Sequence, residues 1–536
     1  SLSPDNTRLA FSWLPRDASS AHIAVKALDS DAVVQLTNGA ANDTMPVWSP
    51  DGRHLAFLRS LREPELRWEI CLVPVTGGLP RVLLRGDGVS PPSLAWWEAG
   101  NALLFSRRAP TTRVFQLTAL DLATLDAQPL TDPPPAPQLA GPGDFLPALA
   151  PDGRTVAFVR ETHEGRDIFL LDLVTRIARR LTRDHRRISG LTWSPDGQAV
   201  IVSSIRSGMM ALYRVALTDG RIERLANTSD EATEPMARGG RLVFSQAQTD
   251  SNIYRVDLRG QRPAGAARLL IGSSRADYAP HISPDGRRIA FLSTRAGGQD
   301  IWVASADGTD PRRLTSVPIA SGPRWSPDGR SIAFGGLAPG SARPDIWTVD
   351  AAGGTPKQLT ADPSYETILA WAADGRSLYF MSDRSGRFEV WNMPAGGGVA
   401  SQVTQGNGLR AQESLDGRFL YYANDVPEVW RRPLRQRSAE KLVIRFPEGT
   451  HWGGNWVAGG SGLYYLNDRV AGPAAIEYLP FGSLGHQRPI RLATFTAAPT
   501  SAVTVFAVAP DESCLVWAQD DYRNSDIMMM EIGGRR

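Results

Sequence analysis

Histidine is the first residue type to consider, because it can act as a general base and as a metal ligand. The chain contains seven histidines, and none of them forms an HxH or HExxH pattern or lies beside a cysteine at ligand spacing. We therefore expect no metal site and no cofactor. The seven residues are His22, His54, His163, His185, His281, His451 and His486.

A serine nucleophile is the second possibility. In hydrolases of the α/β class this serine lies in a Gly-x-Ser-x-Gly elbow between a strand and a helix. Ser461 has glycines around it, in Gly459-Gly460-Ser461-Gly462, but this segment stands where other copies of a repeat have a turn. No α/β stretch is present to hold a catalytic triad. The sequence therefore predicts no catalytic residue and no enzymatic activity.

Asp-Gly pairs recur along the chain and could suggest calcium loops. Their spacing lacks the alternate acidic positions that a calcium loop needs. Each Asp can instead accept a hydrogen bond within its own turn, while Gly accepts a positive φ. We interpret these pairs as turn residues.

The stretch from Pro280 to Thr315 shows what the turns connect. Turn signals at residues 284–286, 296–298 and 306–308 divide it into four short runs. Apolar side chains alternate with polar ones, around Ile289 and Phe291 in one run and around Ile301 and Val303 in the next. The stretch therefore predicts one four-stranded antiparallel sheet.

The same pattern recurs along the whole chain at a spacing of about 45 residues, which is the period of a propeller blade. Many copies continue with a third strand of the Asp-Ile-Trp type and a fourth of the Arg-x-Leu-Thr type. We count roughly twelve copies of the turn and second strand. They begin at Ser3, Ser49, Trp97, Ala150, Ser194, Ala237, Ser283, Ser326, Ala372, Ser414, Ala458 and Ala509.

Composition agrees with a chain of strands and turns. Of 536 residues, 42% are hydrophobic and 21% charged, and 50 Gly and 40 Pro supply the turns. The net charge is +2 with dispersed arginines, so we expect no nucleic-acid binding. No segment approaches the roughly 20 apolar residues that span a bilayer. Cys71 and Cys514 lie among apolar residues and are predicted to be buried and unpaired.

The predicted fold is all-β, with tandem β-propellers in two six-bladed rings of four-stranded antiparallel blades, because single rings hold about four to eight blades. The first ring is expected to comprise residues 1–265 and the second residues 266–536. The soft region Arg259 to Ser274 marks this boundary. A proline-rich insertion from Thr131 to Pro147 is expected to be a surface loop or, alternatively, a binding loop.

A ligand site in such a fold is expected at the mouth of the central channel, where the innermost strands of all blades converge. Their side chains there either solvate the channel or form a polar pocket or docking surface. By contrast, Trp48, Trp193, Trp325 and Trp371 stand at one repeated position and are expected to pack between neighbouring blades. The predicted ligand-binding residues are Asp43, Asp144, Glu234, Asp277, Glu366 and Arg410.

The repeats resemble those of TolB-like propellers built from WD40-like PD40 repeats. The resemblance rests on the Ser-Pro-Asp-Gly turns at residues 49–52, 194–197, 283–286 and 326–329, each followed by an apolar strand. More narrowly, the unbroken series and the ending Asn524 to Met528 are similar to the sensory region of bacterial CadC-type transcriptional regulators. That family implies a periplasmic location and an upstream winged helix and membrane helix. Ser1 opens inside a blade, so we expect the chain to be a piece of a longer protein.

The function predicted from these features is a non-enzymatic sensory or scaffold module that binds a protein partner or a small ligand at the propeller funnel. It would be part of a bacterial signalling or transcription-regulatory protein. The alternative is the non-catalytic propeller portion of a prolyl-oligopeptidase-like serine peptidase, whose hydrolase domain would lie elsewhere.

The last copy of the repeat lacks a recognisable fourth strand. An unpaired strand edge is a liability, and propellers commonly close by borrowing a strand from elsewhere in the chain. We therefore expect residues 266–271 to pair with residues 526–530 of the final copy. This exchange would leave an open edge in the blade that contains residues 252–256.

Overall fold

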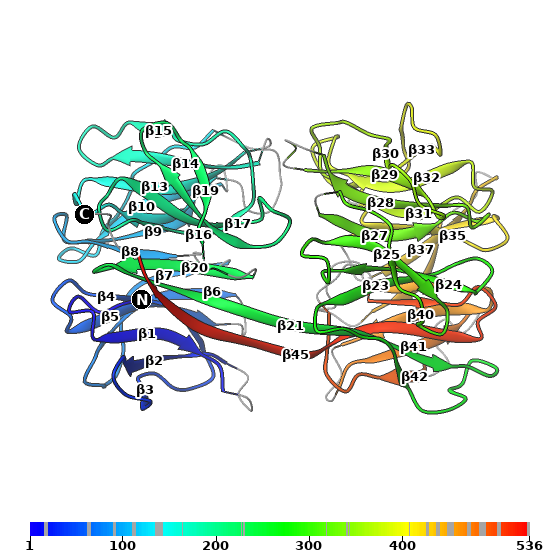
Figure 1. Cartoon of the computed structure of the whole chain (residues 1–536), viewed down its shortest axis with the longest axis horizontal. Coiled ribbons are helices and arrows are strands. Elements are labelled where there is room, and N and C mark those ends of the chain that lie inside the picture. The colour runs from blue at the N-terminus through cyan, green and yellow to red at the C-terminus, as the bar shows by residue number, and fades with distance from the viewer. Residues whose placement is uncertain are drawn as a thin grey trace. The chain divides into compact units, whose positions relative to one another are not determined.

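The computed structural model consists of β-strands joined by short turns (Figure 1). No helix occurs among the described residues, and hence none that is long and apolar enough to cross a membrane. The structure describes the whole chain except residues 16–19, 62–65, 89–92, 110–113, 135–142, 163–164, 227, 229–230, 318, 339–340, 342, 407, 425–427, 436–439, 447–454, 469–472, 482–488, 501–504 and 533–536.

The stretch from which the repeat was derived folds as one four-stranded antiparallel sheet. Its strands, in order, are β23 (Asp277–Ile282), β24 (Arg288–Ser293), β25 (Asp300–Ser305) and β26 (Arg312–Arg313). Phe291 pairs with Trp302, which in turn pairs with Arg313. The predicted sheet is therefore confirmed, and we call each such sheet a blade.

The Ser-Pro-Asp-Gly sequence makes the tight turn between the first two strands of this blade. Ser283 Oγ donates to Asp285 Oδ1 at 2.5 Å and accepts the N–H of Arg288 at 2.9 Å. The N–H of Arg287 donates to Asp285 Oδ1 at 3.1 Å, and Gly286 takes a φ of 69°. The serine, aspartate and glycine thus satisfy the backbone where the chain reverses.

The chain divides into two compact units, which we describe separately. The first unit comprises Ser1–Arg206, Met210–Ala247 and Ser525–Arg536. Its strands are β1 (Arg8–Trp13), β2 (His22–Ala27), β3 (Val33–Gln35); β4 (Asn42–Trp48), β5 (His54–Leu61), β6 (Arg67–Pro74), β7 (Arg81–Asp87); β8 (Leu94–Trp97), β9 (Ala102–Arg108), β10 (Phe115–Asp121), β11 (Ala127–Pro129); β12 (Gly143–Leu149), β13 (Thr155–Thr162), β14 (Gly165–Asp172), β15 (Ala178–Arg180); β16 (Ile188–Trp193), β17 (Ala199–Ser204), β18 (Ala211–Ala216), β19 (Ile222–Arg224); and β20 (Ala232–Arg238) with parts of β21 and β45.

The second unit comprises Ser207–Met209 and Gln248–Asn524. Its strands are β22 (Arg268–Ile271); β23 to β26; β27 (Ala320–Trp325), β28 (Ser331–Leu337), β29 (Pro344–Asp350), β30 (Lys357–Gln358); β31 (Glu366–Trp371), β32 (Ser377–Ser382), β33 (Glu389–Pro394), β34 (Ser401–Gln402); β35 (Arg410–Glu413), β36 (Phe419–Ala423), β37 (Glu428–Pro433), β38 (Lys441–Arg445); β39 (Trp456–Ala458), β40 (Gly462–Asn467), β41 (Ala475–Pro480), β42 (Ile490–Thr494); and β43 (Ala498–Pro499) and β44 (Phe506–Val508) with parts of β21 and β45.

The long strands β21 (Arg241–Asp257) and β45 (Cys514–Glu531) each contribute to both units. In the first unit, the beginning of β21 lies between β20 and the end of β45. In the second unit, the blade order is β44, the beginning of β45, the end of β21, and β22. Each unit therefore takes one strand of a blade from a distant part of the sequence.

The predicted pairing of residues 266–271 with residues 526–530 is wrong. Strand β22 pairs with β21, where Ile271 lies opposite Ile253 and Arg268 opposite Arg255. The strand that changes units is instead β45, whose residues 525–531 lie beside the beginning of β21. The expected open edge at residues 252–256 is therefore also wrong, because β22 pairs with them. The number of blades in each closed ring, and the boundary after residue 265, stay predictions.

Tryptophans at the repeated position link neighbouring blades, as predicted. Trp325 Nε1 donates to the carbonyl of His281 at 3.1 Å, and Trp48 and Trp325 are both buried. Trp193 makes the same bond to Ala148 at 2.9 Å, and Trp371 to Arg324 at 3.0 Å. Each tryptophan thus buries apolar surface between two blades, and its indole N–H finds a hydrogen-bond acceptor there. The two cysteines are buried and unpaired, also as predicted.

The third and fourth strands of a blade are joined by a threonine. Thr315 Oγ1 accepts the N–H of Ile301 at 3.0 Å, and the carbonyl of Ile301 accepts the N–H of Leu314 at 2.8 Å. Leu314 packs in the same apolar cluster as Ile301 and Val303. The equivalent threonines Thr182, Thr360 and Thr404 accept from Ile168, Ile346 and Val390 at 2.9–3.0 Å. The Asp-Ile-Trp and Arg-x-Leu-Thr patterns of the sequence therefore mark the two strands that this threonine joins.

Replacing Thr315 by Val should lower the free energy of unfolding by about 1–3 kcal/mol, because the buried N–H of Ile301 loses its acceptor while the shape is kept. Thr309→Val is the matched control, since the Thr309 hydroxyl bonds only to the exposed Asp307, and should change stability by less than about 0.5 kcal/mol. Urea unfolding measures both. Equal effects would show that the hydroxyl does not join the strands.

Candidate functional site

Two of the predicted site residues, Asp43 and Asp144, are fully buried and bound to arginines. Both carboxylate oxygens of Asp43 accept from Arg59, at 2.8 and 2.9 Å. Those of Asp144 accept from Arg160 at 2.6 and 2.7 Å. Each arginine lies directly across the first strand pair of the blade from its aspartate. These bidentate pairs join the first two strands.

Asp277 and Glu366 are fully buried in the second unit and follow a related pattern. Arg295 donates to Asp277 at 2.6 Å, and Arg384 donates to Glu366. Burial raises the pKa of Glu366, and the charge of Arg384 opposes that rise. An arginine 16 or 18 residues after the acid is the sequence signal for these partners. Whether the acids also bind a ligand stays a prediction.

Glu234 differs from these acids because it is exposed and lies in an irregular part of the first strand pair of its blade. Its φ of 52° is left-handed, which is rare for a residue other than glycine. Of the six predicted residues, Asp43, Asp144 and Glu234 belong to the first unit, and Asp277, Glu366 and Arg410 belong to the second.

The innermost strands of the second unit form a closed circle. Each innermost strand contacts the next one: β23 contacts β27, β27 contacts β31, β31 contacts β35, and β35 contacts β39. Strand β44 contacts β23. Between β39 and β44, the N–H of Val505, just before β44, donates to the side chain of Asn455, just before β39, at 3.3 Å.

Three basic side chains lie on this circle. His281 on β23 accepts the N–H of Trp325 through Nδ1 at 3.3 Å. Arg324 on β27 donates from Nε to the carbonyl of Leu369 on β31 at 2.9 Å. Arg410 on β35, one of the predicted residues, places its guanidinium over the ring of Trp456 on β39, 5.6 Å from the ring centre.

The electrostatics of this basic cluster, formed by His281, Arg324 and Arg410, differ from those of the paired acids. Burial, and then the charge of Arg410, lower the pKa of Arg324 to about 9. Burial lowers the pKa of Arg410 to about 10. Burial, followed by the charge of Arg324, lowers the pKa of His281 to about 3. His281 and Arg410 nevertheless keep partial solvent exposure. An anion placed here would relieve the repulsion between the guanidinium groups.

Sequence reasoning missed His281 and Arg324. Both stand two residues before the serine of the Ser-Pro-Asp-Gly turn, where other blades carry Val47, Thr192 or Ala370. A structural position tends to keep its residue type across repeats, whereas this position carries a histidine and an arginine in two adjacent blades. That departure was a usable signal.

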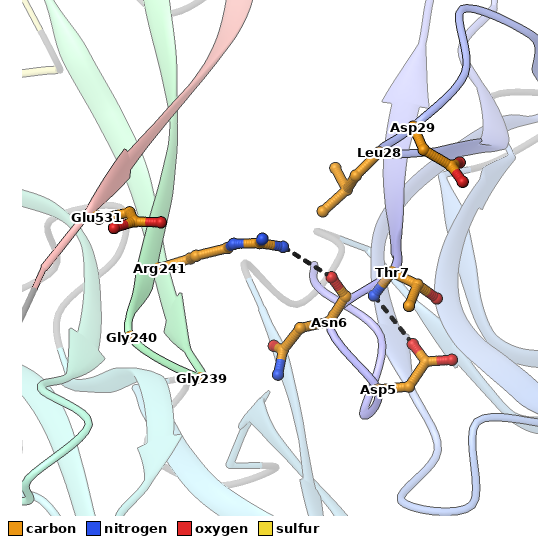
Figure 2. A pocket seen from close by; sticks show the side chains of 9 residues that line it. All are labelled: Asp5, Asn6, Thr7, Leu28, Asp29, Gly239, Gly240, Arg241 and Glu531. Carbon is orange, nitrogen blue, oxygen red and sulfur yellow. Dashed lines mark hydrogen bonds between the residues drawn. The ribbon is translucent and has the colours of Figure 1, made fainter.

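A separate hollow of about 680 Å³ lies in the first unit. Figure 2 shows Arg241 and Glu531 on one side of it and Leu28 and Asp29 on the other. Arg241 donates across it to the carbonyl of Asn6 at 3.0 Å. It is lined by Asp5, Asn6, Thr7, Leu28, Asp29, Gly239, Gly240, Arg241 and Glu531.

Two family models each match a part of this chain. Residues 142–320 match the TolB beta propeller domain, and residues 297–445 match the Tricorn protease N-terminal beta propeller domain. An uncharacterized protein of Agrobacterium fabrum is 24% identical over 265 residues, which are 46% of this chain and 83% of that protein.

Two further relatives are matched over a smaller part of their length. The Tol-Pal system protein TolB of Francisella tularensis is 28% identical over 151 residues, 27% of this chain and 34% of TolB. An uncharacterized peptidase of Bacillus subtilis is 31% identical over 120 residues, 22% of this chain and 18% of the peptidase. The chain thus spans less than two thirds of either protein.

Replacing Asp43 by Asn should lower the free energy of unfolding by about 3 kcal/mol, because it leaves the partly buried Arg59 without its counter-charge. The matched control is Asp31→Asn. Asp31 also pairs with a cation, Lys26, but is fully exposed, and its change should stay below about 0.5 kcal/mol. Chemical unfolding at neutral pH compares the two. Similar losses would mean that the buried pair contributes no more than a surface one.

His281 should make stability depend on pH. Its folded pKa lies below the unfolded value of about 6.5, so the unfolded state binds the proton first. Its contribution is fully present above pH 6.5 and is lost as pH falls toward 3, by up to about 1.4 kcal/mol per pH unit. Unfolding measured between pH 7 and 5 should show this slope, and His281→Gln should reduce it. An unchanged slope in the variant would contradict the buried neutral histidine.

Proposed function

We propose that this chain is a non-enzymatic binding module that receives its ligand within the circle of inner strands of the second unit. The observation that supports this most is the basic cluster of His281, Arg324 and Arg410. Its members lie on β23, β27 and β35, which are innermost strands. Two of them, His281 and Arg324, are basic residues at a repeated position where other blades carry Val47, Thr192 or Ala370.

The chemistry of the cluster favours an anionic group on the ligand. Guanidinium groups bind carboxylates and phosphates through several parallel hydrogen bonds. Arg324 is already oriented by its bonds to the carbonyls of Leu369 and Pro323, both at 2.9 Å. An arginine held in place loses little entropy when it binds. We infer that the ligand, a protein segment or a small molecule, presents a carboxylate or phosphate to this circle.

The wider role we propose is that of a sensory or scaffold region in a bacterial signalling or transcription-regulatory protein located in the periplasm. The match to the TolB beta propeller domain and the TolB relative support a protein-binding module and this location. The regulatory role follows from the CadC-type resemblance of the sequence. The peptidase relative supports the alternative, a propeller portion of a peptidase, over 22% of this chain.

Citrate and inorganic phosphate, compared with chloride at equal ionic strength, should raise the melting temperature of the protein. Arg410→Gln should abolish most of that rise, because it removes a cation from the cluster. Arg418→Gln is the control, since Arg418 is an exposed arginine in the same blade, and it should keep the rise. An equal rise in wild type and Arg410→Gln would refute the anion site.

Purified protein should show no peptidase, esterase or nucleotide hydrolase turnover above buffer. The reason is that the sequence offers no nucleophile elbow. Chromogenic peptide, ester and nucleotide substrates provide the assay. Turnover that co-purifies with the chain and disappears when one serine or histidine is changed would contradict the proposal and favour the peptidase alternative.

A further inference from the structure

The turns between the third and fourth strands of the blades can be compared residue by residue, because one backbone hydrogen bond recurs in them. The N–H of Leu173 donates to the carbonyl of Arg154 at 3.0 Å, as the N–H of Ala306 does to that of Arg287 at 2.8 Å. The residue after this donor is Val174 in the first turn. In the described residues of the other blades, the same position is small, polar or charged: Asp29, Thr76, Ala123, Thr218, Arg259, Asp307, Ala352, Gly396 and Arg435.

The turn between β14 and β15 therefore presents aliphatic side chains to water. Val174 is 74% exposed and Ile177, at the other end of the turn, is 67% exposed. Leu79 and Val399 are also exposed in such turns, but each is the only large exposed apolar residue of its turn. Two neighbouring aliphatic side chains in water cost free energy that burial against an apolar partner would recover.

Hydrogen bonds hold this turn in one shape. Asp172 Oδ1 accepts the N–H groups of Val174 and Thr175, both at 2.9 Å. The N–H of Asp172 donates to the carbonyl of Ile177 at 3.1 Å. The other carboxylate oxygen of Asp172 accepts from Arg154 at 2.8 Å, so the negative charge at the turn is already paired. The turn thus carries its two aliphatic side chains on an ordered backbone.

Arginines are concentrated directly beside these aliphatic residues. Residues 174–187 contain six arginines and one acidic residue, Asp184, whose carboxylate is itself bound to an arginine. Arg176, Arg179 and Arg183 are exposed, and their side chains form no hydrogen bond or ion pair with any described residue. The net charge of the whole chain is only +2, so this segment is a local excess of positive charge.

Arg179 shows that this charge is not used inside the fold. It stands three residues before Thr182, the position that Arg312 and Lys357 occupy in their own blades. Arg312 donates to a backbone carbonyl of the next blade at 2.6 Å, and Lys357 does so at 3.0 Å. Arg179 makes no such bond in the described part of the chain. Its guanidinium group is therefore available to an external anion.

The shape of this region decides which anion fits. Strand β15 is the outermost strand of its blade, and no described strand pairs with its other edge. At about 3.3 Å per residue, Arg176 and Arg183 are roughly 23 Å apart along that edge. A nucleic acid would pair with the arginines but would leave the aliphatic side chains in water. A convex turn also offers no groove to a polypeptide, whereas a lipid bilayer presents both phosphates and an apolar interior.

We propose that Val174 and Ile177, with Arg176, Arg179 and Arg183, form a surface that docks the first unit on an anionic lipid bilayer. The two aliphatic side chains enter the boundary between headgroups and acyl chains, and the arginines bind lipid phosphates. All five residues belong to the first unit. The proposal is therefore independent of the anion site in the second unit.

Co-sedimentation of the full chain with lipid vesicles tests this surface. Vesicles made of equal parts of phosphatidylglycerol and phosphatidylcholine should bind the protein, and added salt should weaken that binding because it screens the arginines. Vesicles of phosphatidylcholine alone should bind about tenfold more weakly or less, because they carry no net charge. Absence of binding to the anionic vesicles, or equal binding to both kinds, overturns the proposal.

Two multiple variants separate the aliphatic part from the basic part. Val174→Asp with Ile177→Asp, and Arg176→Gln with Arg179→Gln and Arg183→Gln, should each weaken vesicle binding by about tenfold or more. Circular dichroism confirms that each variant is folded. Unchanged binding by either variant overturns the proposal.

The controls change net charge by the same amount at exposed positions elsewhere, and both should bind vesicles as wild type does. They are Leu79→Asp with Val399→Asp, and Arg53→Gln with Arg287→Gln and Arg330→Gln. An equal loss of binding in a control and its matched variant would show that net charge alone decides binding, and would overturn the proposal.

Other polyanions and the second unit are tested in parallel. A DNA duplex and polyglutamate should bind more weakly than the anionic vesicles, because neither buries the aliphatic side chains. Tighter binding of either one, kept by the Val174→Asp and Ile177→Asp variant, would overturn the lipid assignment. Arg410→Gln should bind vesicles as wild type does, and loss of vesicle binding in that variant would place the lipid site in the second unit and overturn the proposal.

Discussion

Pairing of the third strand with the fourth is the interaction on which a complete blade depends. Where it is made, Ile301 or Ile346 loses all exposure, because the fourth strand brings a Leu over it and a threonine hydroxyl to its N–H. The tryptophan bonds then join finished blades to their neighbours. Neither the third nor the fourth strand buries its apolar side chains without the other.

Function in such a repetitive fold is best sought where the repeat is broken. The carboxylates at the start of the innermost strands repeat, and the structure gives them repeated arginine partners, which is the behaviour of structural groups. The basic cluster of the second unit does not repeat. Its guanidinium groups offer hydrogen-bond donors of the kind that bind carboxylates and phosphates.

The fold could be predicted from the sequence because turn residues and alternating side chains act locally. Ser283, Asp285 and Gly286 form their turn among themselves, so one copy of the repeat shows its structure. The exchange of β45 could not be predicted, since the third strands of two blades look alike in sequence and only tertiary packing decides which blade takes which. Arg410 was found by its position, whereas Arg324 and His281 were missed, although they are basic at a position where other repeats carry Val47, Thr192 or Ala370.

The Nε–H resonance of Arg324, followed by NMR while citrate is added, is the most direct measurement of the basic cluster, since this N–H is held by the carbonyl of Leu369. If the cluster receives an anion, the resonance shifts with citrate and reaches a plateau, while chloride at equal ionic strength leaves it in place. If citrate and chloride have the same effect, no anion binds there and the account is wrong.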